Sequence, residues 1–180
     1  MKHYDAEGNL TQVESGCDTT NLQQMISEEF PAERYHGKVM IESHDSFVYE
    51  AETDNLDATL AGKTWKELDS SFVTTNHDEY VLMNGSAVVA FLGAWLWRAA
   101  EALDAQNQVR SSLIFQLATY GGFQADGSGL WGRSLKSLNQ RQRNVIRLLL
   151  ECATETAKEG ELNLMDRALK SVINNPYTTS

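Results

Sequence analysis

The chain has 180 residues, which fits one domain that can bury a core without help from disulfides. It carries a net charge of −10 at pH 7, and the acidity belongs to the first half: residues 1–90 hold 5 Lys and Arg against 17 Asp and Glu, whereas residues 91–180 hold 10 against 8. This balance disfavours nucleic acid as a partner, because phosphate binding rests on Lys and Arg, and it favours a basic partner. Solubility is the ordinary alternative explanation of such a charge.

The amino-terminal sequence Met-Lys-His-Tyr-Asp-Ala-Glu-Gly lacks the apolar stretch of a secretory signal, and the run Ala87–Trp97 is too short to cross a bilayer of about 30 Å. We therefore expect a cytoplasmic protein with no membrane partner. Cys17 lies in a polar stretch and Cys152 on the apolar side of a late helix pattern, without the spacing of a disulfide framework. Both are expected to be free thiols.

Neither an internal repeat nor a linker divides the chain. Residues 1–18 are polar and show no hydrophobic period, so we expect a loose arm there. A single helical domain should follow at 19–175, with a short tail at 176–180.

The first predicted helix runs from about Asn21 to Phe30, because Thr20 and Gln23 have capping-box spacing and Pro31 ends the pattern. Over residues 38–50 apolar and polar side chains alternate instead. This alternation favours a small β-hairpin.

Residues 42–57 form the most polarised window of the chain, with six carboxylates and no Lys or Arg. One interpretation is a solvated loop; the other is an anionic patch that meets a basic protein surface, with nearby aromatic side chains as anchors. A divalent-cation site is disfavoured, because the ligand positions of an EF-hand loop do not occur together. The candidate partner-binding residues are Glu42, Asp45, Phe47, Tyr49, Glu50, Glu52, Asp54, Asp57 and Trp131.

The most apolar stretch, Ser86–Leu103, predicts a central helix that is buried nearly all round, since no charged side chain occurs from Ala87 to Trp97. Gly93 costs about 1 kcal/mol against Ala inside a helix, so we expect another helix to approach it closely. Trp95 and Trp97 lie about 200° apart around an ideal helix. They should therefore point into layers on opposite flanks.

The fold class predicted from these patterns is mainly α: a single-domain bundle of about five to six helices around the central one. Asn139 and Gln142 have capping-box spacing before an apolar helix, as do Thr64 and Glu67 before a short one. The remaining helical segments are expected at 56–60, 111–120, 139–158 and 162–173, and a Gly-rich connection is expected at 121–133.

No residue set has the spacing of a catalytic, metal or cofactor site, so none of the three is expected. Gly127–Gly132 matches the G-x-G-x-x-G motif, but a helix pattern precedes it and no apolar period follows, whereas a dinucleotide site needs a strand before it and a helix after it. A carboxylate and histidine hydrolase stays an alternative, and it requires one pocket to hold several of five residues. These are Glu42, His44, Glu50, His77 and Asp78.

Four segments together resemble a family of small bacterial proteins of unknown function, over roughly residues 20–157. They are Gly62–Leu68, Tyr80–Leu103, Arg110–Leu117 and Leu138–Gln142.

In size, acidity and lack of a catalytic signature the chain is also similar to immunity proteins of bacterial toxin systems, including contact-dependent inhibition. That likeness implies a non-enzymatic inhibitor that binds and neutralises a cognate basic toxin domain. The interface could use either the acidic window or the Gly-rich connection at 121–133. A phage-type inhibitor or DNA mimic is the alternative binding protein, and it would require acids in regular rows along one surface.

Overall fold

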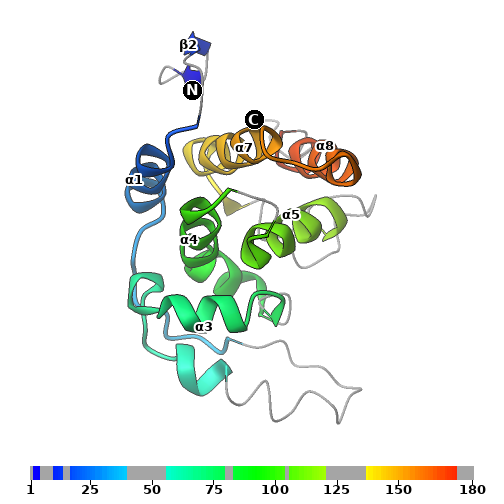
Figure 1. Ribbon diagram of the computed structural model, residues 1–180. Helices are drawn as coiled ribbons and strands as arrows, with labels where there is room; N and C mark the ends of the chain where they lie inside the picture. The colour runs from blue at the N-terminus through cyan, green and yellow to red at the C-terminus, as the bar shows by residue number, and fades with distance from the viewer. Residues whose placement is uncertain are drawn as a thin grey trace.

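The fold is seen in a computed structural model (Figure 1), which describes residues 2–4, 10–13, 17–39, 56–79, 83–103, 106–120 and 137–173. The protein is mainly helical, which confirms the predicted fold class. The named elements are β1 (Lys2–Tyr4), β2 (Leu10–Val13), α1 (Thr19–Glu29), η1 (Trp65–Glu67), α3 (Ser70–Thr75), α4 (Gly85–Glu101), α5 (Gln108–Tyr120), α7 (Gln140–Thr154) and α8 (Glu159–Ile173).

Helix α4 is the centre of the bundle, and α1, η1, α3, α5 and α7 all pack against it. In Figure 1 α4 lies between α1 on one flank and α5 on the other, with α7 and α8 side by side at one end and α3 at the opposite end. The helix begins where the Asn84 side chain accepts hydrogen bonds from the backbone N–H groups of Ser86 and Ala87, at 3.1 and 2.9 Å. Trp95 in its middle is 0 % exposed, as a central buried helix requires.

Gly93 of α4 leaves room for the indole of Trp65. A Cβ atom at Gly93 would lie 2.7 Å from Cε2 of that ring. The indole Nε1 donates a 2.9 Å hydrogen bond to the carbonyl of Phe30, which fixes the ring against the helix. The close approach expected at Gly93 is therefore made by a side chain of the 3₁₀ helix η1 rather than by the backbone of a second helix.

Helix α1 starts two residues before its predicted position. Its N-cap is Asp18, whose carboxylate accepts from the N–H groups of Thr20 and Asn21 at 3.0 and 3.2 Å, so Thr20 lies inside the helix. The helix ends at Glu29 ahead of Pro31, and Leu22 and Ile26 form its buried face.

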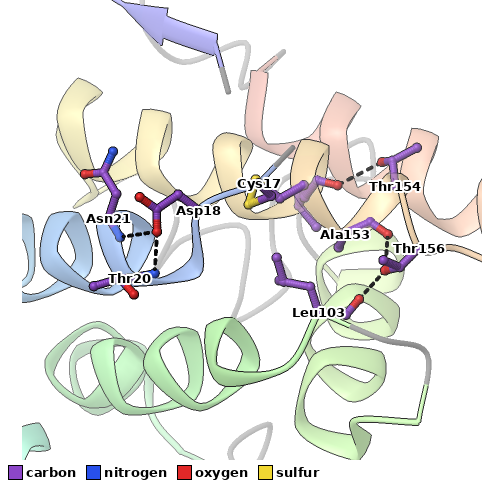
Figure 2. Close-up of a disulfide and its surroundings, with 10 residues drawn as sticks. Cys17, Asp18, Thr20, Asn21, Leu103, Ala153, Thr154 and Thr156 are labelled. Atoms are coloured by element: carbon purple, nitrogen blue, oxygen red, sulfur yellow. Dashed lines mark hydrogen bonds between the residues drawn. A yellow bond between two sulfur atoms is a disulfide. The ribbon is translucent and has the colours of Figure 1, made fainter. Parts of the chain in front are cut away.

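A disulfide joins Cys17 to Cys152, so the expectation of two free thiols is wrong (Figure 2). The Cα atoms are 5.4 Å apart, within the usual range for a disulfide. Cys17 directly precedes the α1 N-cap and Cys152 lies on α7, and these two helices pack together. The pairing depends on that tertiary contact, which the spacing of two cysteines 135 residues apart does not encode.

The structure describes part of the arm predicted at 1–18 but almost none of the hairpin predicted at 38–50. Within the expected arm, β1 and β2 pair antiparallel, with Lys2 opposite Val13 and Tyr4 opposite Leu10, although the sequence there showed no strand period. The hairpin predicted at 38–50 lies outside the described residues apart from its first two positions.

None of the helices that the structure describes combines the length and apolarity of a membrane crossing.

Candidate functional site

The acidic window lies almost entirely outside the described residues, and Asp57 is its one described acid. The Asp57 side chain accepts a 2.7 Å hydrogen bond from the backbone N–H of Val39, which is buried. Asp57 therefore has a role within the fold, holding the chain at Val39 against the residues that follow the window. The other candidates, which lie outside the described residues, are Glu42, Asp45, Phe47, Tyr49, Glu50, Glu52, Asp54 and Trp131.

Several further acids of the first half stabilise the starts of helices. Besides Asp18 of α1, the Asp69 carboxylate caps α3 by accepting from the Ser71 N–H at 2.6 Å. Hydrogen bonding by the Ser71 side chain, and then by its backbone N–H, lowers the pKa of Asp69. Glu67 accepts from the Thr64 N–H at 2.7 Å, and that bond lowers its pKa, with nearby Arg34 adding to the effect. Part of the acid excess is thus explained by capping, where carboxylates are favoured by the helix dipole.

Two arginines near the start of α7 make contacts within the protein. Arg143 is buried, and its Nε donates to the Leu138 carbonyl at 3.0 Å. Arg141 lies 3.8 Å from the carboxylate of Glu29 on α1. Arg143 thus helps to fix the beginning of α7, whereas Arg141 keeps 73 % of its side chain exposed.

His77 and Asp78 are two of the five residues required by the hydrolase alternative, and they meet Ser112 of α5. The Ser112 hydroxyl lies 2.5 Å from Asp78 Oδ1, and the imidazole Nε2 of His77 lies 3.4 Å from Asp78 Oδ2. In a Ser-His-Asp triad the imidazole stands between the hydroxyl and the carboxylate and takes the hydroxyl proton. Here the carboxylate stands in the middle, so His77 is not placed to take the proton of Ser112.

The same contacts do explain how α3 is tied to α5. The Ser112 hydroxyl also lies 2.9 Å from the His77 carbonyl, and Gln116 one turn later donates to Ser112 Oγ at 3.0 Å. Ser112 is 6 % exposed, whereas the Asp78 side chain is 72 % exposed. These contacts hold the segment after α3 against α5 and have a structural role. The other three residues of the alternative, Glu42, His44 and Glu50, lie outside the described residues.

A cavity lies where α1, η1, α3 and α4 meet, and we call it the tryptophan pocket. It encloses about 330 Å³. The lining residues are Ser27, Trp65, Lys66, Leu68, Ser70, Val73, Ala94, Trp97 and Arg98.

Two indole rings form the wall of the tryptophan pocket. Trp65 and Trp97 have ring centroids 6.1 Å apart with planes tilted by 44°. Trp65 is fixed by Gly93 and by the Phe30 carbonyl, so it holds Trp97 in a defined place. Trp97 is half-buried while Trp95 is fully buried, which agrees with the prediction that the two rings point to different sides of the helix.

Two cations lie at the tryptophan pocket, and no carboxylate is among its lining residues. The Lys66 ammonium lies 5.3 Å from the centroid of the Trp65 ring and donates to the Ser27 hydroxyl at 2.6 Å. Arg98 donates through Nε to the Thr74 hydroxyl at 3.1 Å and forms an ion pair with Glu101, one turn along α4. Arg98 is thus partly neutralised, whereas Lys66 has no carboxylate partner among the described residues.

The sequence gives little sign of this pocket. The rotation between Trp95 and Trp97 places Trp97 on a separate face, but Lys66 and Arg98 are 32 positions apart and only the packing of η1 on α4 brings them together. In the described ranges, no group of three or more His, Cys, Asp or Glu side chains is arranged to hold a metal ion.

Comparison with known proteins gives no relative from which a role could be transferred: no family model, no curated protein and no solved structure matches the chain.

Proposed function

We propose that this protein is a non-enzymatic inhibitor of the immunity type, which binds a cognate bacterial toxin domain through the acidic window at residues 42–57. The observation that supports the proposal is the charge pattern: six carboxylates and no Lys or Arg in sixteen residues, in a chain whose second half has a small positive excess. A basic active-site surface, such as one that binds phosphates, is the natural complement of such a segment.

The acids that cap helices support this assignment indirectly, because they explain part of the acid excess without a partner. The acids at 18, 67 and 69 stabilise helix starts, so the excess that they represent needs no partner. The window contains the densest remaining group of acids in the first half. Opposite charges across an interface mainly accelerate association, so the window is proposed to speed encounter, with Phe47 and Tyr49 as the apolar anchors.

A cytoplasmic location is part of the same proposal, because an immunity protein of this kind protects the cell that makes it. The disulfide between Cys17 and Cys152 is more typical of an oxidising compartment. Fractionating the cells and detecting the protein in each fraction tests the location. Recovery in the cytoplasmic fraction would support the proposal, and recovery in an extracytoplasmic fraction would contradict it.

The direct experiment is co-expression in cells with the carboxyl-terminal domain of the protein encoded immediately upstream. We expect the domain alone to stop growth and the pair to restore it. Growth arrest that persists at equal expression of both proteins would contradict the proposal. A variant in which Glu50, Glu52 and Asp54 are replaced by Lys should protect less well than the original chain.

A further inference from the structure

We propose that the tryptophan pocket binds a small amphipathic carboxylate, with its flat apolar body against Trp97 and its anionic group at the Lys66 ammonium. This inference is independent of the proposed function, because the pocket is lined by residues outside the acidic window. The two can therefore fail separately.

The shape of the pocket suits a ring-sized apolar group. Its volume of about 330 Å³ falls at the lower end of the range of ligand pockets, about 300–1,000 Å³. Leu68, Val73 and Ala94 provide apolar surface beside the two indoles. Trp97 keeps part of its ring accessible, so a planar ligand can stack in an offset or tilted arrangement against it.

The charge of the pocket selects an anion. The only charged lining residues are Lys66 and Arg98, although the whole chain carries a net charge of −10. Indole rings by themselves attract cations, but the face of Trp65 already has the Lys66 ammonium over it. A second cation would be repelled by Lys66, whereas a carboxylate gains a charge-assisted hydrogen bond from the exposed ammonium.

Lys66 is positioned for this role. The Ser27 hydroxyl accepts one of its three N–H bonds and the Ser27 carbonyl lies at 3.5 Å, which orients the ammonium without neutralising it. The Ser70 hydroxyl, on the α3 side of the pocket, can donate to the second carboxylate oxygen. Arg98, held by Thr74 and Glu101, contributes to the positive potential of the rim.

The test uses three naphthalene probes that differ only in their polar group: 2-naphthoate, 2-naphthalenemethanol and 2-naphthylmethylamine. Each is titrated into the ¹⁵N-labelled protein while the indole N–H signals are recorded by NMR. We expect the carboxylate to shift the Trp97 signal saturably and to bind about tenfold tighter than the alcohol, with the amine weakest. The Trp95 signal should stay in place, since that ring is in the core and does not line the pocket.

A matched pair of variants isolates the charge. Lys66→Gln should reduce carboxylate affinity about tenfold and leave affinity for the alcohol unchanged, whereas Lys63→Gln removes the same charge outside the pocket and should change neither. Equal binding of all three probes, no saturable shift with any of them, or equal losses in both variants would overturn the proposal. If Lys66→Gln failed to fold, the ranking of the three probes on the original chain would still decide it. Toxin neutralisation should be unaffected by Lys66→Gln.

Discussion

Replacing Gly93 by Ala is the sharpest test of how α4 and η1 fit together. Helix propensity alone favours the change by about 1 kcal/mol, because Gly93 lies inside a helix. The added Cβ, however, would lie 2.7 and 2.8 Å from Cε2 and Cδ2 of Trp65. That ring cannot easily move away, since its Nε1 is hydrogen-bonded to the Phe30 carbonyl. Overpacking of this kind costs about 1–3 kcal/mol. The expected net result is a loss of about 1 kcal/mol in the free energy of unfolding.

The matched control is Gly160→Ala in the first turn of α8, where an added Cβ meets no atom within 4 Å. This variant should gain up to about 1 kcal/mol, because the backbone entropy of the unfolded chain falls without any clash. Urea denaturation of both variants, followed by circular dichroism, measures the difference. If Gly93→Ala were stabilised as much as Gly160→Ala, Trp65 would not lie against α4. That result would contradict the placement of Trp65 in the wall of the tryptophan pocket.

Three further outcomes are expected. Cys17→Ser, or reduction of the original chain, should lower the free energy of unfolding by about 2–5 kcal/mol, because the disulfide closes a loop of some 135 residues; identical urea midpoints with and without reductant would contradict this. Glu161→Gln should lower the free energy of unfolding by about 3 kcal/mol in the same assay, because it removes the carboxylate 3.0 Å from the guanidinium of Arg110, which is 0 % exposed. Replacing both partners by apolar residues should lower it less. The folded-state pKa of Glu67 is lowered, so its contribution to the free energy of unfolding is present above its unfolded pKa and is lost as pH falls through the folded pKa. Glu67→Gln should therefore flatten the acid side of a plot of this free energy against pH. An unchanged slope would contradict the hydrogen bond between Glu67 and Thr64.

Local rules predicted the helices well where the signal is carried by neighbouring residues. The reciprocal cap of Asn139 and Gln142 starts α7, as their spacing indicated. The start of α1 was misplaced because two suitable residues, Asp18 and Thr20, lie two positions apart. The carboxylate is the N-cap in the structure, and propensity ranks the two side chains too closely to separate them.

Features that depend on contacts between distant segments could not be predicted in the same way. The Cys17 to Cys152 bond follows from packing of α1 on α7, and the tryptophan pocket follows from the fit of Trp65 to Gly93. The sequence marked Gly93 as a position of close approach but not the residue that approaches it. The acidic window was found from charge alone, and of its predicted site residues the structure describes Asp57, which binds the Val39 N–H.

The most direct test of the central claim is the association rate of the purified protein with the purified toxin domain, measured by stopped flow at low and high salt. One variant replaces Glu50, Glu52 and Asp54 by Lys. The control replaces the exposed acids Glu155, Glu159 and Asp166 by Lys, which changes the net charge by the same amount. We predict that the window variant associates at least tenfold more slowly and loses most of its salt dependence, whereas the control keeps most of both. Equal slowing in the two variants, or none in either, would contradict recognition through the acidic window.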